Sequence, residues 1–74
     1  MNTLDILPIG KEGNIKEINC NPNIKRRMMD LGIVKDTKIK AILKSPSGNL
    51  KAYEVRGSII AIRKEDAKNI IIKN

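Results

Sequence analysis

Residues of the types that perform catalysis are sparse in this sequence and are not arranged in pairs. The chain has no histidine, the side chain that most often serves as a general base and a metal ligand. Glu65 and Asp66 are its only adjacent acidic residues, and neighbouring positions on a helix do not face the same way. The serines lie outside any nucleophile-elbow pattern, and the glycines are spread singly rather than clustered as in phosphate-binding loops. We therefore expect no enzyme, no catalytic residue and no cofactor.

Cys20 is the only thiol and admits two interpretations. It lies just ahead of a predicted helix and near Lys25 and Arg26, a setting that lowers the pKa of a thiol and makes it reactive. Alternatively, it is a small, partly buried apolar side chain, which is the interpretation we favour. A single cysteine cannot form an internal disulfide, and this fits a reducing compartment. Because Cys20 has no companion ligands of its own type, we predict no metal site within the chain.

The densest group of cations lies in the stretch IKRRMMDLGI at residues 24–33. The whole chain has 15 Lys and Arg against 8 Asp and Glu, a formal charge of +7 that attracts acidic partners. Nucleic acid, an anionic membrane surface and an acidic protein surface all qualify. When the stretch is helical, Lys25, Arg26 and Met29 point away from its apolar face. A flexible methionine beside two cations is a plausible contact for another protein, so these three are our candidate partner-binding residues.

A helix with signals at both ends must position these side chains. Asn21 is a good N-cap, Pro22 suits the first helical position, and Gly32 suits the left-handed residue that ends a helix. Helical spacing places three apolar side chains on one face, which we expect to be buried: Ile24, Met28 and Leu31. Ile33, just past the glycine, is expected to fold back onto Met28.

The rest of the chain predicts short strands separated by turns. Alternation is clearest at 37–44, where Ile39, Ala41 and Leu43 are expected to face the core. The spacing of Ile15 and Ile18 indicates a bulge or twist in a second strand. The expected strands span residues 3–7, 14–19, 37–44, 50–55, 59–63 and 70–73, with turns at 45–49 and 56–58 and one helical turn at 64–68.

This pattern predicts one mainly β domain over residues 1–74, a small antiparallel β-barrel of five to six short strands with one short α-helix. The many isoleucines favour pleated sheet. The first residues lack the basic and apolar regions of a signal peptide, and no apolar run approaches the length of a membrane span. We therefore expect a soluble, cytosolic protein.

Nucleic acid is one alternative partner. Small barrels that bind single strands usually stack the bases on aromatic side chains, and Tyr53 is the only aromatic residue here. We expect weak, salt-dependent binding and no specific nucleic acid. Direct binding of a transition metal is the other alternative, and we expect no such site in the isolated chain.

The order of these motifs resembles the FeoA-like domain family, the small cytosolic ferrous iron transport protein A of bacterial iron uptake. The core of the resemblance is RRMMDLGIVKDTKI at residues 26–39, with paired arginines, two apolar residues, an acid, Leu-Gly-aliphatic and a turn before a strand. Further matches are Gly13, Ile15, Pro46, Gly48, Gly57, the run at 60–63 and Ala67. The chain departs from the family pattern at Met28, Met29, Asp36, Ser47 and Leu50.

The resemblance implies an SH3-like β-barrel that works by protein contact as a non-enzymatic accessory protein. The implied partner is the large membrane permease for ferrous iron, which carries a cytosolic GTP-binding domain. We expect a cytoplasmic protein recruited to the inner face of the membrane through this partner, without membrane insertion, and self-association is left open. The predicted partner-binding residues are Lys25, Arg26 and Met29, with Pro46 and Tyr53 as weaker candidates.

Overall fold

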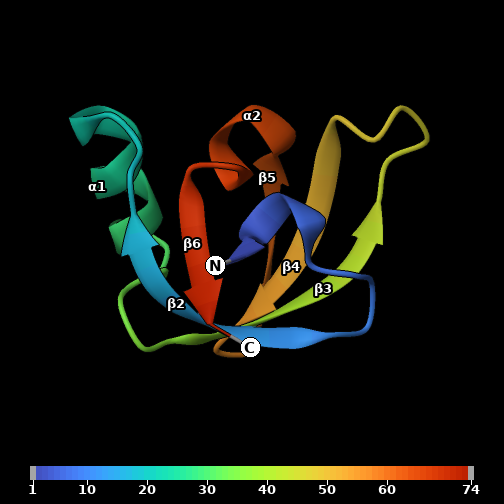
Figure 1. The fold of residues 1–74 in the computed structure, drawn as a ribbon, viewed down its shortest axis with the longest axis horizontal. Helices are drawn as coiled ribbons and strands as arrows, with labels where there is room; N and C mark the ends of the chain where they lie inside the picture. The colour runs from blue at the N-terminus through green and yellow to red at the C-terminus, as the bar shows by residue number, and fades with distance from the viewer. Residues whose placement is uncertain (1, 74) are drawn as a thin grey trace.

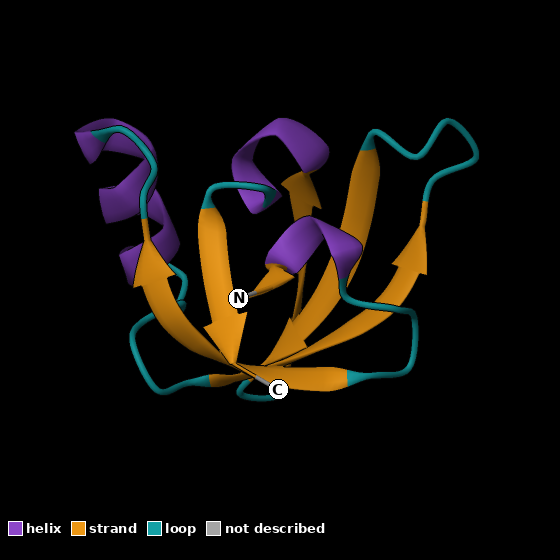
Figure 2. Ribbon diagram, in the orientation of Figure 1, coloured by secondary structure: helices purple, strands orange, loops and turns teal. Residues whose placement is uncertain are grey.

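The computed structural model describes residues 2–73, which form one curled antiparallel sheet with short helices along one rim (Figures 1 and 2). Its strands are β1 (Asn2–Thr3), β2 (Glu12–Ile18), β3 (Lys38–Lys44), β4 (Leu50–Val55), β5 (Ser58–Arg63) and β6 (Ile70–Lys73). The helices are the 3-10 helix η1 (Leu4–Ile6), α1 (Pro22–Asp30) and α2 (Lys64–Ala67). The hydrogen-bonded order is β1-β6-β2-β3-β4-β5, so β1 and β5 are the edges. The predicted small antiparallel β-barrel with one main helix is confirmed.

Aliphatic side chains fill the inside of the curled sheet. Ile15, Ile39, Val55, Ile70 and Ile72 are each at most 2% exposed. Burying such a side chain contributes roughly 1.5–3 kcal/mol, and β-branched residues also suit the pleated backbone. This core is what holds the strands, and therefore the surface side chains between them, in fixed positions.

Two side chains of β4 tie the N-terminal segment to the sheet. The Lys51 ammonium donates to the carbonyl oxygens of Asp5 and Leu7, at 2.9 and 2.7 Å. The Tyr53 hydroxyl donates to the carbonyl of Leu4 at 3.3 Å. The edge strands β1 and β5 do not pair with each other, so these bonds help to close the barrel where no backbone ladder does.

The strand expected at residues 3–7 is wrong. Only Asn2 and Thr3 pair with β6, and the chain then turns into the 3-10 helix η1. Leu4 and Leu7 are both buried, and their spacing of three suits a helix with about three residues per turn. In a strand, residues three apart point to opposite faces, so one leucine would face solvent.

Bulges shift the register of two strands. The irregularity expected near Ile15 and Ile18 is confirmed, because the pairing of β2 with β6 slips between Ile15 and Glu17 and both isoleucines stay buried. A second slip, between Ala41 and Leu43, interrupts the pairing of β3 with β4. Leu43 is 58% exposed for this reason, and its expected burial is wrong.

Candidate partner-binding surface

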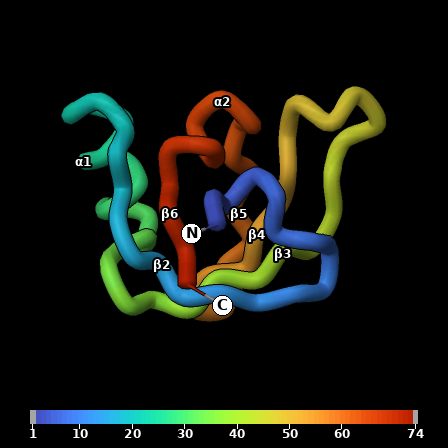
Figure 3. Tube along the Cα trace, viewed as in Figure 1, coloured from blue at the N-terminus to red at the C-terminus, as the bar shows by residue number. Residues whose placement is uncertain are grey.

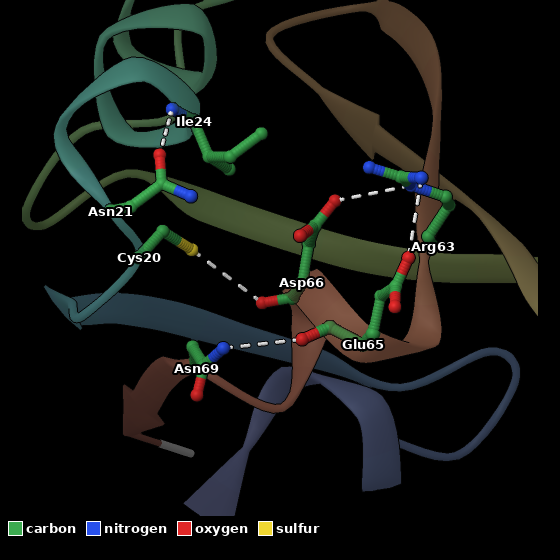
Figure 4. A network of polar contacts seen from close by, with 7 residues as sticks. All are labelled: Cys20, Asn21, Ile24, Arg63, Glu65, Asp66 and Asn69. Carbon is green, nitrogen blue, oxygen red and sulfur yellow. Dashed lines mark hydrogen bonds and ion pairs between the residues drawn. The ribbon is translucent and has the colours of Figure 1, made fainter.

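Local hydrogen bonds fix both ends of α1. The Asn21 Oδ1 atom accepts a bond from the Ile24 amide at 3.0 Å, which is the predicted N-cap (Figure 4). At the other end the amides of Gly32 and Ile33 donate to the carbonyls of Met29 and Met28, at 3.0 and 2.9 Å. Gly32 has φ +91, as the left-handed position of this helix ending requires. Because both ends of the helix are fixed, the set of side chains that it exposes to solvent is fixed as well.

The three helix residues predicted to bind a partner are all exposed. Lys25 and Met29 line a shallow hollow of about 240 Å³ between α1 and β2, which we call the α1–β2 pocket. Met29 is 48% exposed. Arg26 is exposed on α1 but is not among the residues that line this pocket. The other lining residues are mainly apolar or cationic: Ile15, Ile18, Val34, Lys16 and Lys35, together with Glu17.

Pro46 lies far from this pocket. It is exposed on the turn between β3 and β4, at the opposite end of the rim from α1 in Figure 1. A bond from the Gly48 amide to the Ser45 carbonyl, 2.9 Å long, closes the turn, and Gly48 has φ +80. The fold therefore does not bring Pro46 together with Lys25, Arg26 and Met29, and α2 lies between them.

Tyr53 does not lie on the surface at all. Its residue exposure is 0%, and its hydroxyl is bonded to the carbonyl of Leu4. Burial, and to a smaller extent the Asp5 carboxylate, raises the pKa of Tyr53 far above its ordinary value of 10.0. The candidate contact at Tyr53 is thus corrected: the ring is a core residue, because it faces the inside of the barrel on the same side of β4 as Val55.

A second hollow lies on the opposite flank of α1, and we call it the α1–β5 groove. It has a volume of about 410 Å³ and runs between α1 and β5. Leu31, expected in the core, is 46% exposed and lines this groove instead, so that prediction is wrong. Met28 alone of the predicted helix face is fully buried, since the groove separates the end of α1 from the sheet. The remaining apolar lining includes Ile24, Leu50, Ile60 and Ala61.

Polar contacts connect α2 to the groove (Figure 4). The Arg63 guanidinium forms ion pairs with Glu65 at 3.2 Å and with Asp66 at 3.4 Å. The Cys20 thiol, just before α1, donates to the Asp66 carbonyl at 3.6 Å. Figure 4 shows Asp66 between Cys20 and Arg63. Asp66 of α2 thus contacts both Arg63 of β5 and Cys20 in the segment before α1.

Cys20 behaves as a partly buried structural residue. Burial raises the pKa of its thiol above 9.0, and the negative charge of Asp66 adds to the effect. This direction is opposite to that of an activated thiolate. Within residues 2–73, no group of three or more His, Cys, Asp or Glu side chains is placed to hold a metal ion. In the same range, no helix is long and apolar enough to cross a membrane.

The sequence predicted Lys25 and Met29, two residues of the α1–β2 pocket, as partner-binding candidates, but it indicated neither the pocket itself nor the α1–β5 groove. The groove combines α1 with the start of β4 and with β5, and only the fold reveals that these segments are neighbours. A usable signal was the apolar run at 59–62, which is longer than a strand with one solvated face needs. Leu50, which departs from the expected family pattern, was a second signal.

Comparison with known proteins gives a consistent result. The family model described as the FeoA domain matches residues 2–74. The solution structure of FeoA from Chlorobium tepidum superposes with a TM-score of 0.93 at 26% identity, covering 97% of this chain and 69% of that one. The FeoA-like protein of Clostridium acetobutylicum gives a TM-score of 0.85 at 30% identity, covering 99% and 88%.

A third similar structure is that of Stenotrophomonas maltophilia FeoA in complex with zinc. It gives a TM-score of 0.85 at 26% identity and covers 99% of this chain and 91% of that one. That protein is described as a procaryotic SH3 domain protein and as a candidate activating factor of bacterial ferrous iron transport. No curated protein sequence matches this chain.

Proposed function

The chain belongs to the FeoA domain family, and from this premise we propose that it is a non-enzymatic accessory protein of bacterial ferrous iron uptake. It acts by binding the cytosolic GTP-binding domain of the membrane ferrous iron permease. The protein works in the cytoplasm and is recruited to the inner face of the membrane by this contact.

The outward side of α1 carries the proposal. It combines an exposed methionine with exposed cations beside the apolar floor of the α1–β2 pocket. An apolar centre with a charged rim is the usual composition of a protein interface. The excess of positive charge selects an acidic surface and accelerates the encounter with it. Pro46 lies at the other end of the rim. It can be a second contact only for a partner large enough to reach across α2, from α1 to the β3–β4 turn.

Nucleic acid is a weaker candidate than a protein partner. Tyr53, the only aromatic side chain, is buried and offers no platform on which a base could stack. Binding would then depend on phosphate contacts alone and would weaken steeply with salt.

Charge reversal on α1 tests the proposal. The double variant Lys25→Glu, Arg26→Glu should weaken binding to the GTP-binding domain by about tenfold or more, as measured by isothermal titration calorimetry. Both side chains are exposed, so the melting temperature should change little. The double variant Lys11→Glu, Lys38→Glu is the matched control, because it makes the same change of net charge at exposed positions outside α1.

Equal losses in the two double variants would mean that only net charge matters and would contradict a contact at α1. Unchanged binding in both would remove α1 from the interface altogether.

A further inference from the structure

The edge of the sheet at β5 offers unpaired backbone groups. β5 pairs only with β4, through a hairpin whose two turn residues, Arg56 and Gly57, have φ of 52° and 83°. In such a hairpin the residues flanking the turn form a hydrogen-bonded pair, and bonded pairs alternate with unbonded ones. The bond from the Lys64 amide to the Asn49 carbonyl, 2.8 Å long, fits this alternation at the far end of the ladder.

The same alternation identifies the outward groups. Ile59, Ala61 and Arg63 stand at the unbonded pairs, so their amides and carbonyls point away from β4. Within residues 2–73, the amides of all three and the carbonyls of Ile59 and Ala61 have no backbone partner outside the sheet ladder, whereas the carbonyl of Arg63, the N-cap residue of α2, accepts the first bond of that helix. The backbone of another extended chain can form hydrogen bonds with these outward amides and carbonyls. A helix cannot, because its own backbone groups are already hydrogen-bonded within the helix.

The α1–β5 groove lies directly beside this edge. Ile60 and Ala61 of β5 line one wall. Ile24 of α1 and Leu31, the residue that follows this helix, line the other. Leu50, which is 43% exposed, also lines the groove, at the end nearest α2 and the β3–β4 turn. A strand added to β5 points every second side chain to the same side, so alternate residues of it enter the groove. Apolar side chains are the ones that this lining accepts.

The charges at the rim of the groove determine which side chains suit the remaining positions of the added strand, those that do not enter the groove. Arg63 is already engaged in ion pairs with Glu65 and Asp66 and is therefore not counted as a free cation. Arg27 lines the groove, and Lys64 and Lys68 line the hollow that continues it past Leu50 and Arg63. In the described part of the chain none of these three cations forms an ion pair. Acidic residues on the partner would complement them.

We propose that β5 accepts an extended segment of the permease's cytosolic region as an additional antiparallel or parallel strand, with alternating apolar and acidic side chains. The inference rests on the proposed function and adds the mode of recognition. A second copy of this chain is a poorer occupant, because each copy carries a charge of +7 and supplies no excess of acidic residues.

A proline at position 61 tests the mode of binding. Ala61→Pro removes one outward amide and leaves the β4 ladder intact, as proline on an edge strand does when its missing donor faces solvent. The matched control is Ala61→Val, which keeps the amide and suits a strand. We expect Ala61→Pro to weaken binding to the GTP-binding domain by roughly tenfold or more relative to Ala61→Val, which also alters the groove lining but keeps the amide.

Amide hydrogen exchange on the wild-type complex gives a second, independent measurement. Strand addition should slow exchange at Ile59, Ala61 and Arg63, in that alternating pattern, while the intervening amides are already bonded to β4. This measurement decides the question even if Ala61→Pro does not fold, which its urea unfolding curve would show.

The outcomes separate the two proposals. Binding that survives Ala61→Pro, with protected amides confined to α1, would overturn strand addition and leave the proposed function standing. No binding by the wild type would overturn both. If sedimentation shows that Ala61→Pro turns a dimer into a monomer while partner binding is unchanged, the occupant of the edge is a second copy, and our assignment is wrong.

Discussion

The phenol ring of Tyr53 lies in the barrel core, and its hydroxyl still reaches a partner there, the carbonyl of Leu4. A lone aromatic in a basic chain has the composition of a binding residue, which is why the sequence misled us. Alternation along β4 was the better guide, because it places Tyr53 on the same face as the buried Val55. The bonded hydroxyl is what makes burial of this polar group acceptable.

Titration of Tyr53 should make the protein less stable at high pH. Its pKa is raised by folding, so the neutral ring contributes stability that is complete below pH ~10, the unfolded value, and is lost as the pH rises above it. Tyr53→Phe loses the hydrogen bond, about 0.5–1.5 kcal/mol at neutral pH, but has no phenol to ionise. Urea unfolding of both proteins from pH 7 to 11 should therefore show their difference shrinking above pH ~10 and then reversing.

Other groups titrate in the same range, but their contributions to the free energy of unfolding cancel in the difference between the two proteins. The raised pKa of Cys20 acts in the same direction as that of Tyr53. The pKa of Lys51 is lowered, mainly by burial, so its contribution to stability rises with pH toward the unfolded value. If the difference in free energy of unfolding between wild type and Tyr53→Phe stays constant up to pH 11, then folding does not raise the pKa of Tyr53, and this prediction is wrong.

At the scale of elements, α1 was predictable because its signals are local. The N-cap at Asn21, the proline after it and the glycine at its end each act within one turn. The bulges in β2 and β3 differ in this respect. The spacing of Ile15 and Ile18 revealed the first, whereas the alternation of Ile39, Ala41 and Leu43 concealed the second. That bulge depends on pairing with β4, which the strand's own residues do not encode.

Loss of the N-cap should weaken α1 measurably. Asn21→Ala leaves the Ile24 amide without its acceptor and should cost about 1 kcal/mol of the free energy of unfolding. Asn23→Ala is a suitable control, because this exposed helical residue forms no such cap and alanine has the higher helix propensity. Urea unfolding followed by circular dichroism measures both, and equal stability of the two variants would mean that the cap contributes nothing.

At the scale of the whole molecule, the arrangement of distant segments decides both the closure of the barrel and the position of its surface groove. Lys51 joins β4 to the N-terminal segment, and residues of α1, β4 and β5 together line the α1–β5 groove. The fold class could be predicted from strand pattern and family resemblance. The groove could not, because edge position is a property of strand order, and that order places β5 last in the sheet.

Removing the Lys51 ammonium should loosen the N-terminal segment. Lys51→Met keeps an unbranched side chain that is one atom shorter, but leaves the carbonyls of Asp5 and Leu7 without this donor. We expect a loss of about 1–2 kcal/mol in urea unfolding and faster amide exchange in η1. Lys44→Met, at the exposed cross-strand neighbour of Lys51, should have little effect. Similar losses in both variants would argue that charge, rather than the two bonds, is responsible.

The strand order also has a consequence for folding during synthesis. β6 follows the other five strands of this sheet in the chain but inserts between β1 and β2, the first two (Figure 3). The earlier part of the chain can form the β3–β4–β5 meander and α1, but β1 has no neighbour in the sheet until residues 70–73 have been synthesised. Pairings of such long sequence separation form slowly. We therefore expect the isoleucines of β2 to be exposed, and available to a chaperone, until β6 has been synthesised and pairs with β2.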